Sequence, residues 1–204
     1  MVTPQLYDQG EESWKLKIHC GAGNCYLENY WNIDLAGLLA KDYPAETLLN
    51  VTDVRDYYAR LNATFPELPQ RRACYVDEFM DMRELQYPRN SISKILAIQC
   101  FEHLSPVSAL STLINWWSVL TPGGVLVISV PDMRETLKLL EGTHAEQSFA
   151  IRHLRGSARD EFNYHQAWYT PESFTELLQS VGFTVEILYN FHLYPAIVRR
   201  ARKG

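Results

Sequence analysis

The sequence has neither an excess of basic residues nor a long apolar run. Its 204 residues include 19 lysines and arginines against 24 acidic residues, which gives a net charge of −5. A general nucleic-acid binder needs a basic face to neutralise phosphates, so this balance argues against nucleic acid as a partner. No apolar segment approaches the ~18 residues of a membrane span, and no basic region followed by an apolar stretch opens the chain. We therefore expect a soluble, cytoplasmic protein without a membrane span.

Paired cysteines are also missing. The four cysteines form no C-x-x-C pair, and no histidine stands at ligand spacing beside them. We therefore expect no structural zinc site and no other bound metal. A basic cluster does occur at Arg199, Arg200, Arg202 and Lys203, and such a cluster is more typical of a solvated tail than of an RNA-binding or membrane-binding patch.

The alternation of apolar and polar segments predicts one α/β domain over residues 1–204. Segments read as strand, helix, strand, which indicates a Rossmann-like, doubly wound, mostly parallel seven-stranded sheet with helices on both faces. The expected strands are 15–19, 30–35, 73–79, 94–100, 125–130, 184–189 and 196–200. The expected helices are 106–120 and 171–181, closed by the turn at 121–124 and by Gly182. Residues 36–72, with three prolines around a helical pattern, are interpreted as an insertion that covers a site.

The expected helix over 106–120 has an apolar stripe, which we interpret as core packing. Its members stand at helical spacing: Val107, Leu110, Leu113, Ile114, Trp117 and Leu120. The segment 134–168 has no clear periodicity, and the pattern predicts no element there.

A glycine-rich turn follows the first expected strand. Gly21 and Gly23 leave the backbone open to close approach by a ligand, because no side chain intervenes. Asp34 ends the second strand, where a carboxylate can accept hydrogen bonds from both hydroxyls of a ribose. These positions fall at the carboxyl ends of adjacent parallel strands, which is where open α/β sheets bind ligands.

Two further strand ends extend the same crevice. Asp81 follows the third strand, where its carboxylate could accept from an adenine amino group, and Met82 offers apolar contact to the ring. The fourth strand is closed by Gln99, Cys100 and Phe101. A nicotinamide cofactor is the main rival ligand, but its fingerprint needs a third glycine where Tyr26 stands, and Asp34 follows the turn far sooner than the ~20 residues expected.

In order and spacing, these motifs resemble the class I methyltransferases that depend on S-adenosylmethionine (SAM), of the sort found near cell-surface sugar biosynthesis. The matching segments are 20–24, 31–34, 81–85, 101–104, 120–126, 130–132 and 182–183. The resemblance implies that Gly21, Ala22 and Gly23 flank the methionine part of SAM, Asp34 the ribose, and Asp81 with Met82 the adenine. The other expected cofactor-binding residues are Cys20, Leu35, Gln99, Cys100 and Phe101.

Three positions depart from the family pattern. The family usually has a glycine where His19 stands, an acidic or amide residue where Lys17 stands, and an acidic residue where Ser93 stands. A histidine side chain at position 19 could crowd the methionine part of the cofactor. A non-catalytic subunit that keeps the fold therefore stays open as an alternative to an enzyme.

Methyl transfer from a sulfonium needs the acceptor aligned in line with the methyl carbon and water excluded. A hydroxyl acceptor also benefits from a base, and His103 and His165 are the candidate catalytic residues, with Glu102 as a further carboxylate beside them. Around His165, Tyr164 and Tyr169 could line an acceptor pocket or simply pack. Aromatic residues in the two expected lid segments suit a sugar acceptor: Tyr57, Tyr58, Trp168 and Tyr169.

The leading hypothesis is O-methylation of a glycan or a sugar precursor. The alternatives are methylation of a non-sugar hydroxyl or amine on a small molecule, and the non-catalytic subunit. A homodimer or a partner enzyme is compatible with all three hypotheses.

Overall fold

The computed structural model describes residues 16–43, 73–158 and 161–204. Its strands are β1 Leu16–Cys20, β2 Trp31–Asp34, β3 Leu38–Leu39, β4 Tyr75–Val76, β5 Glu78–Phe79, β6 Ile92–Ile98, β7 Leu120–Pro131, β8 Phe183–Ile187 and β9 Ala196–Lys203. Its α-helices are α2 Pro106–Val119, α3 Met133–Lys138, α4 His144–Arg155 and α5 Pro171–Ser180. The short 3₁₀ helices are η1 Ala40–Asp42, η3 Phe101–His103, η4 Leu139–Glu141 and η5 Glu161–Asn163. Most of the expected 36–72 insertion, with Tyr57 and Tyr58, lies outside the described residues.

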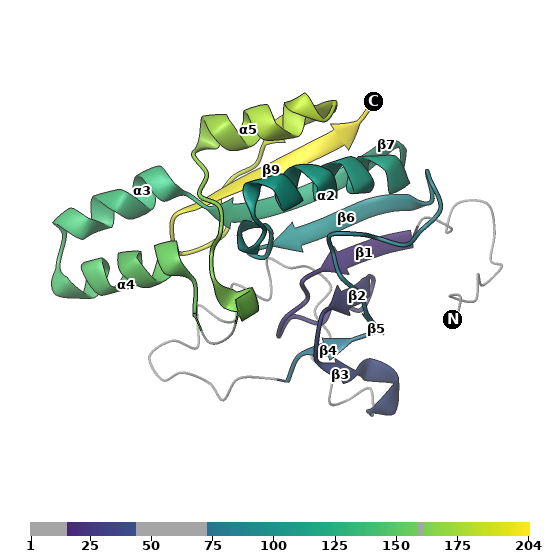
Figure 1. Ribbon diagram of the computed structural model, residues 1–204, viewed down its shortest axis with the longest axis horizontal. Helices are drawn as coiled ribbons and strands as arrows, with labels where there is room; N and C mark the ends of the chain where they lie inside the picture. The colour runs from purple at the N-terminus through teal and green to yellow at the C-terminus, as the bar shows by residue number, and fades with distance from the viewer. Residues whose placement is uncertain (1–15, 44–72, 159–160) are drawn as a thin grey trace.

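Within the described residues, seven strands form one sheet in the order β5-β2-β1-β6-β7-β9-β8. The neighbours from β5 to β7 are parallel, whereas β9 runs antiparallel to both β7 and β8. The predicted fold class, a Rossmann-like and mostly parallel seven-stranded sheet with helices, is confirmed. The carboxyl ends of β1, β2, β5 and β6 therefore meet along one edge of the sheet, and α3 and α4 lie together beyond the carboxyl end of β7 (Figure 1).

The alternation of side chains along the strands divides the core between the two faces of the sheet. On one face, Ile95 and Ile128 belong to a large cluster that is covered by α2 and α5 (Figure 1). On the other face, Leu96 and Val127 belong to a smaller cluster that connecting segments close, with Phe191 packed against it. No helix of the described residues is long and apolar enough to cross a membrane.

The prediction of one strand over 73–79 was wrong in one respect, because this segment forms two short strands, β4 and β5. β4 pairs with β3 in a separate two-stranded sheet, and β5 pairs with β2 in the main sheet. The break falls at Asp77, whose carboxylate accepts hydrogen bonds from the Asn32 backbone N–H at 2.7 Å and from the Tyr26 hydroxyl at 2.7 Å. A side chain that replaces ladder hydrogen bonds in this way lets the strand change sheets.

The prediction that the apolar stripe of α2 is buried was also partly wrong. Val107 and Ile114 are 82% and 55% exposed, whereas Trp116 is fully buried. The helix is turned so that the stripe through Ala109, Leu113 and Trp116 faces the sheet. Leu113 belongs to both stripes, which is why helical spacing alone did not separate them.

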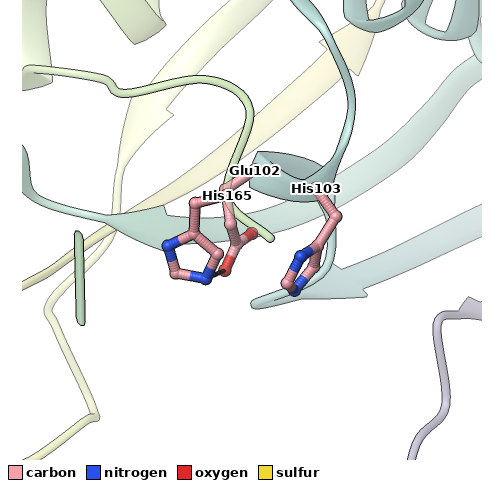
Figure 2. A group of neighbouring side chains, drawn as sticks. All are labelled: Glu102, His103 and His165. Carbon is pink, nitrogen blue, oxygen red and sulfur yellow. Dashed lines mark ion pairs between the residues drawn. The ribbon is translucent and has the colours of Figure 1, made fainter. Parts of the chain in front are cut away.

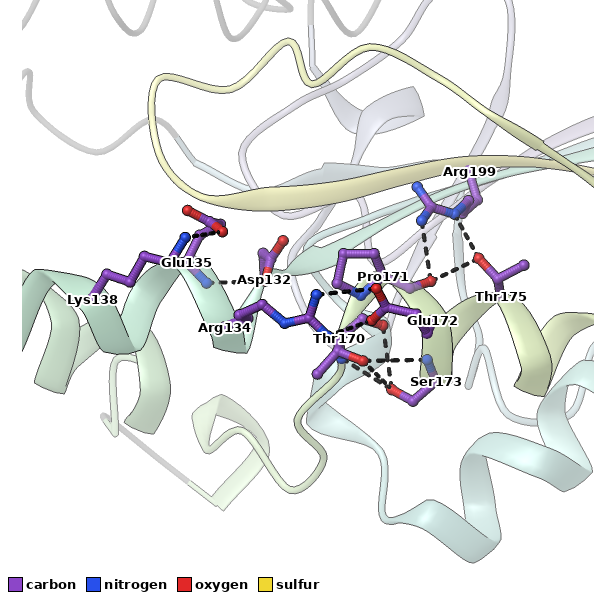
Figure 3. A network of polar contacts seen from close by, with 10 residues as sticks. All are labelled: Asp132, Arg134, Glu135, Lys138, Thr170, Pro171, Glu172, Ser173, Thr175 and Arg199. Carbon is purple, nitrogen blue, oxygen red and sulfur yellow. Dashed lines mark hydrogen bonds and ion pairs between the residues drawn. The ribbon is translucent and has the colours of Figure 1, made fainter.

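The basic cluster at the end of the chain is not a solvated tail. It belongs to β9, which lies between β7 and β8 and in which most side chains are buried and only Arg202 is exposed. Arg199 is 5% exposed and donates to the Pro171 carbonyl at 3.1 Å and to Thr175 Oγ1 at 2.9 Å (Figure 3). Lys203 is 6% exposed and donates to the Leu120 carbonyl at 2.8 Å. Both cations are therefore parts of the packed structure.

The segment without clear periodicity folds into α3 and α4. Asp132 caps α3 by accepting from the Glu135 N–H at 3.2 Å, and Thr143 caps α4 in a reciprocal capping box. Arg134 at the start of α3 pairs with Glu172 at the start of α5, with an N–O distance of 2.6 Å (Figure 3). These local caps begin helices whose apolar pattern is too weak to be read from the sequence.

Candidate active site

A pocket of about 510 Å³ opens at the carboxyl ends of β1, β2, β5 and β6. This volume lies within the ~300–1,000 Å³ typical of small-molecule and cofactor sites. The pocket is lined by Gly21, Gly23, Asp34, Leu35, Met80, Asp81, Met82, Arg83, Gln99, Cys100, His103, Leu104, Phe162, Asn163 and Gln166. The predicted crevice and this pocket therefore occupy the same edge of the sheet.

The glycine turn forms the floor of the pocket beside β1. Gly21 has a φ of +61°, and a Cβ at this position would lie 2.6 Å from the Cβ of Cys100. Gly23 has a φ of +51° but open space around it, with its nearest neighbour at 3.9 Å. Only glycine adopts such conformations readily. Gly21 is therefore required both by its backbone angle and by the close approach of Cys100.

Asp34 ties this turn to the end of β2. One carboxylate oxygen accepts a hydrogen bond from the Gly23 N–H at 2.9 Å, and the other accepts from the Leu35 N–H at 2.7 Å. A carboxylate offers about four lone-pair positions, so two backbone bonds leave further acceptor capacity toward the pocket. Asp34 thus shapes the turn and keeps oxygen atoms for a ligand.

His19 does not crowd the pocket. It is 2% exposed, does not line the pocket, and contacts Asn32 Oδ1 through Nδ1 at 3.0 Å on the opposite face of the sheet from Ile18. Burial lowers the pKa of His19 to about 4, although its hydrogen bond to Asn32 opposes the shift. The steric objection raised by the departure from the family glycine is therefore removed, because strand alternation turns this side chain away.

Asp81 and Met82 lie on the opposite wall. The Asp81 carboxylate pairs with Arg83 at 2.5 Å and also accepts from the Arg83 backbone N–H at 2.9 Å. Burial acts to raise the pKa of Asp81, but the hydrogen bonds and charge of Arg83 outweigh it and hold the pKa below its usual value. Met80 and Met82 add apolar side chains to the same wall.

The end of β6 supplies the remaining predicted cofactor residues. Gln99 has a φ of +53° and donates through Nε2 to Ser129 Oγ at 2.9 Å, while Cys100 lines the pocket beside it. The structure does not bring every predicted residue to the pocket surface. Three lie fully buried behind it, namely Cys20, Ala22 and Phe101.

The two histidines predicted as catalytic lie side by side with Glu102. We name Glu102, His103 and His165 the histidine cluster; their side chains converge although His165 is far away in the sequence (Figure 2). The two imidazole ring centroids are 4.8 Å apart, and His165 Nε2 lies 3.8 Å from Glu102 Oε1. His103 is the member that lines the pocket.

Burial disfavours charge on two members of the histidine cluster. It raises the pKa of the Glu102 carboxyl to about 8. Burial, followed by the neighbouring charges of His103 and His153, lowers the pKa of His165 to about 4. At neutral pH the Glu102–His165 contact is therefore mainly one between neutral groups rather than an ion pair.

The aromatic residues near His165 divide between packing and surface. Tyr169 is 7% exposed and packs against Phe101 and Phe174, so the prediction that it forms part of a lid was wrong. Tyr164 is 39% exposed and does not line the pocket, but its carbonyl contacts His103 Nδ1 at 3.0 Å. Trp168 is 55% exposed and donates to the Leu154 carbonyl at 2.9 Å.

Some residues that line the pocket were not predicted: Met80, Arg83, Leu104, Phe162, Asn163 and Gln166. Met80 and Arg83 flank the Asp81–Met82 motif and could have been found by extending it. The last three reach the pocket because the N–H groups of Gln166 and Ala167 donate to the Glu102 carbonyl at 2.8 and 3.2 Å. A contact of this long sequence separation has no local signal.

A family described as "Methyltransferase domain" matches residues 23–188 of the chain. The chain belongs to this methyltransferase-domain family. The match covers the pocket from Gly23 through the histidine cluster and runs to the end of β8, so the family predicted from the sequence is confirmed. No curated protein matches this chain.

Solved structures agree on the fold. A carbon methyltransferase, CurJ, matches with a TM-score of 0.53 and 14% identity over 96% of this chain, which spans 50% of that protein's length. A SAM-dependent methyltransferase from Methanosarcina mazei has a TM-score of 0.50 and 14% identity, over 94% of this chain and 92% of its own. A SAM-dependent methyltransferase from Aquifex aeolicus has a TM-score of 0.50 and 15% identity, over 94% of this chain and 85% of its own. The fold is therefore that of SAM-dependent methyltransferases.

Proposed function

We propose that the protein transfers a methyl group from SAM to a hydroxyl of a glycan or glycan precursor. The observation that carries the proposal is the Gly21–Gly23 turn held by the Asp34 carboxylate. Gly23 leaves open space at the pocket, and this space fits the methionine part of SAM. The Asp34 carboxylate fits a ribose and the apolar Met82 an adenine ring. The fold shared with SAM-dependent methyltransferases supports the same cofactor.

The chain itself has a limited chemical task. SAM, when bound, supplies a methyl group on a positively charged sulfur. The residues of the pocket have to hold the acceptor oxygen in line, exclude water and deal with the hydroxyl proton. We assign the last task to the histidine cluster, in which His103 faces the pocket while His165 and Glu102 lie behind it. Positioned proton transfer is typically worth about 10²–10⁴-fold in rate.

The pocket lining beside the histidine cluster suits an acceptor rich in hydroxyl groups. Asn163 and Gln166 carry amides that both donate and accept hydrogen bonds, and Phe162 adds an aromatic ring that is 56% exposed. Amides with an aromatic face are a combination that matches the polar edge and apolar face of a sugar ring. This lining favours a sugar over an acceptor without hydroxyl groups.

The cofactor assignment is tested by thermal-shift titration with SAM and its demethylated product. A ligand at 100 times its dissociation constant stabilises the native state by about 2.7 kcal/mol. We expect Asp34→Ala to abolish this shift and Asp34→Asn to weaken it. Asp42→Ala is the matched control, because Asp42 is exposed and does not line the pocket. An unchanged titration in Asp34→Ala would show that the ribose binds elsewhere.

The acceptor assignment needs labelled methyl transfer into a panel of nucleotide-sugars, glycans, phenols and amines. We expect label in the sugar-containing acceptors, and a drop in turnover of about 10²-fold or more in His103→Ala and His165→Ala. Label in phenols or amines alone would favour the small-molecule alternative. Cofactor binding without transfer to any of these acceptors would favour the non-catalytic subunit.

A further inference from the structure

The histidine cluster contains a buried carboxylate oxygen that lacks a hydrogen-bond partner. Glu102 is 1% exposed, and its Oε2 is fully buried with no partner within the described residues. A buried carboxylate is costly unless a proton or a cation compensates it. Among the described residues, the side chain of Glu102 has one ionisable neighbour within 4.0 Å: His165 Nε2 lies 3.8 Å from Oε1, which is too long for a hydrogen bond.

Both imidazoles are oriented by backbone carbonyls. Nδ1 of His103 lies 3.0 Å from the Tyr164 carbonyl oxygen, which can only accept, so Nδ1 is the nitrogen that donates in this contact. His165 also donates to the backbone of His153, while its Nε2 faces Glu102 (Figure 2). Metal-binding histidines typically donate their second N–H to a carbonyl or carboxylate in this manner.

We propose that Glu102, His103 and His165 bind one divalent transition-metal ion at the wall of the pocket. One ligand atom from each side chain lies within 4.8 Å of the others. Bonds of ~2.1 Å place the ligands of a bound ion about 3.0–3.5 Å apart, so small side-chain rotations close the set. This proposal replaces the expectation of no metal, which was drawn from sequence spacing around the cysteines.

The donor set points to a transition metal rather than to magnesium. Two imidazole nitrogens and one carboxylate suit zinc, iron, nickel or manganese, whereas magnesium prefers oxygen ligands alone. Three protein ligands leave at least one coordination position open. Because His103 lines the pocket while Glu102 and His165 lie behind it, the open position faces the pocket.

This arrangement defines the acceptor class more narrowly, and that step rests on the proposed function. A hydroxyl that binds a divalent ion loses its proton more readily, because the ion stabilises the alkoxide. The ion, rather than a free histidine, would then lower the cost of deprotonation, and the proton would pass to solvent water at the mouth of the pocket. An acceptor with two neighbouring oxygen atoms, such as a vicinal diol of a sugar, would bind best if two positions are open.

Metal binding is tested first without any substrate. The full chain carries no histidine tag and is first treated with chelator. It is then titrated with Co²⁺ and followed by visible absorption. A second titration, with Zn²⁺, is followed by calorimetry. We expect one ion per chain and the absorption bands of nitrogen- and oxygen-bound Co²⁺. Absence of stoichiometric binding of either ion, or equally tight binding of Mg²⁺, would overturn the proposal.

Three variants locate the ion. Glu102→Gln keeps the shape of the side chain. We expect Glu102→Gln and His165→Ala each to weaken Co²⁺ binding by at least about 100-fold, because the loss of even an outer-shell partner of a metal ligand lowers metal affinity by about 10–100-fold. His144→Ala is the matched control, since His144 is exposed at the start of α4 and should bind the ion like the wild type. Equal Co²⁺ affinity in all three variants would place the ion elsewhere. Circular dichroism confirms that each variant is folded.

The metal proposal and the proposed function fail in different ways. If the protein binds Co²⁺ as expected but SAM produces no thermal shift, the cofactor assignment fails and the metal site stands. If SAM binds and labelled methyl transfer is unaffected by chelation, the role of the ion in deprotonation is overturned and the histidines remain as proton acceptors. Loss of transfer on chelation, restored by Zn²⁺, Mn²⁺ or Co²⁺ in the wild type but not in Glu102→Gln, supports both.

Discussion

The two halves of the sheet are held together by different forces. In the half that carries the cofactor wall, β1, β2 and β5 have five, four and two residues. In the other half, β7 and β9 have twelve and eight residues and pair in a continuous antiparallel register. The long strands hold themselves by ladder hydrogen bonds, whereas the short ones depend on individual polar side chains.

Asn32 makes the largest set of polar contacts described in the short-strand half. It is fully buried, donates to the carbonyls of Leu27 and Tyr30, and also contacts Asp77 and His19. A ligand-binding edge requires tight turns rather than long ladders, so the chain stabilises it by side chains that bind the backbone. We therefore expect single substitutions to lower the free energy of unfolding more in the short-strand half than in the long-strand half.

The largest effect is expected from Asn32→Ala. Its amide oxygen also accepts from the Leu27 N–H at 2.9 Å, so several buried groups would lose their partners at once. At about 1–3 kcal/mol for each unsatisfied group, the free energy of unfolding should fall by about 4 kcal/mol or more. Asn190→Ala, in the β8–β9 connection, makes fewer such bonds and should cost about 1 kcal/mol. Urea unfolding compares the two; equal losses would break the contrast between the halves.

A pair of glycine substitutions separates steric exclusion from backbone strain. Gly21→Ala adds a clash with Cys100 to an unfavourable φ, and we expect a loss of about 3 kcal/mol together with loss of SAM binding. Gly23→Ala meets open space, so only the strain of about 1–2 kcal/mol should remain. Thermal unfolding and SAM titration of both variants provide the measurement. Gly23→Ala being the more destabilised variant would contradict the geometry.

Buried His19 should make the short-strand half sensitive to acid. Its pKa is about 4 in the folded state against 6.5 for the free side chain, so the unfolded chain binds the proton first as the pH falls. Stability is therefore unaffected above pH 6.5 and declines between pH 6.5 and about 4, by about 3 kcal/mol in total from this residue. We expect His19→Leu to flatten the slope of unfolding free energy against pH in that window. A slope identical to that of the wild type would remove His19 as a source of acid sensitivity.

The smallest of the four effects tests the long-strand half. Lys203 donates to Asn90 Oδ1 and to the Leu120 carbonyl, both at 2.8 Å, and its ammonium lies 4.1 Å from the centre of the Trp117 ring. Lys203→Ala should lower the free energy of unfolding by about 2 kcal/mol. Arg202→Ala, at an exposed position of the same strand, should change it by about 0.5 kcal/mol or less. Equal losses of unfolding free energy for the two variants in guanidinium would contradict the buried role of Lys203 and favour a solvated tail.

Features that depend on neighbouring residues were predictable, and those that depend on distant contacts were not. The glycine turn, Asp34 and the helix that begins at Pro171 are local patterns, and the structure contains each of them in place. The break of the third strand depends on Asp77 binding a residue of another strand, and the buried stripe of α2 depends on which side meets the sheet. Neither the partner nor the side is encoded within the segment itself.

The sequence alone determined the fold class, the positions of most strands along the chain and many of the residues at their carboxyl ends, because turns, caps and apolar periodicity act over a few residues. Only the tertiary structure decided that Glu102 lies beside two histidines, that His19 points away from the pocket and that Arg199 and Lys203 are buried. These outcomes depend on how elements pack against one another, and packing joins residues whose separation along the chain carries no local signal.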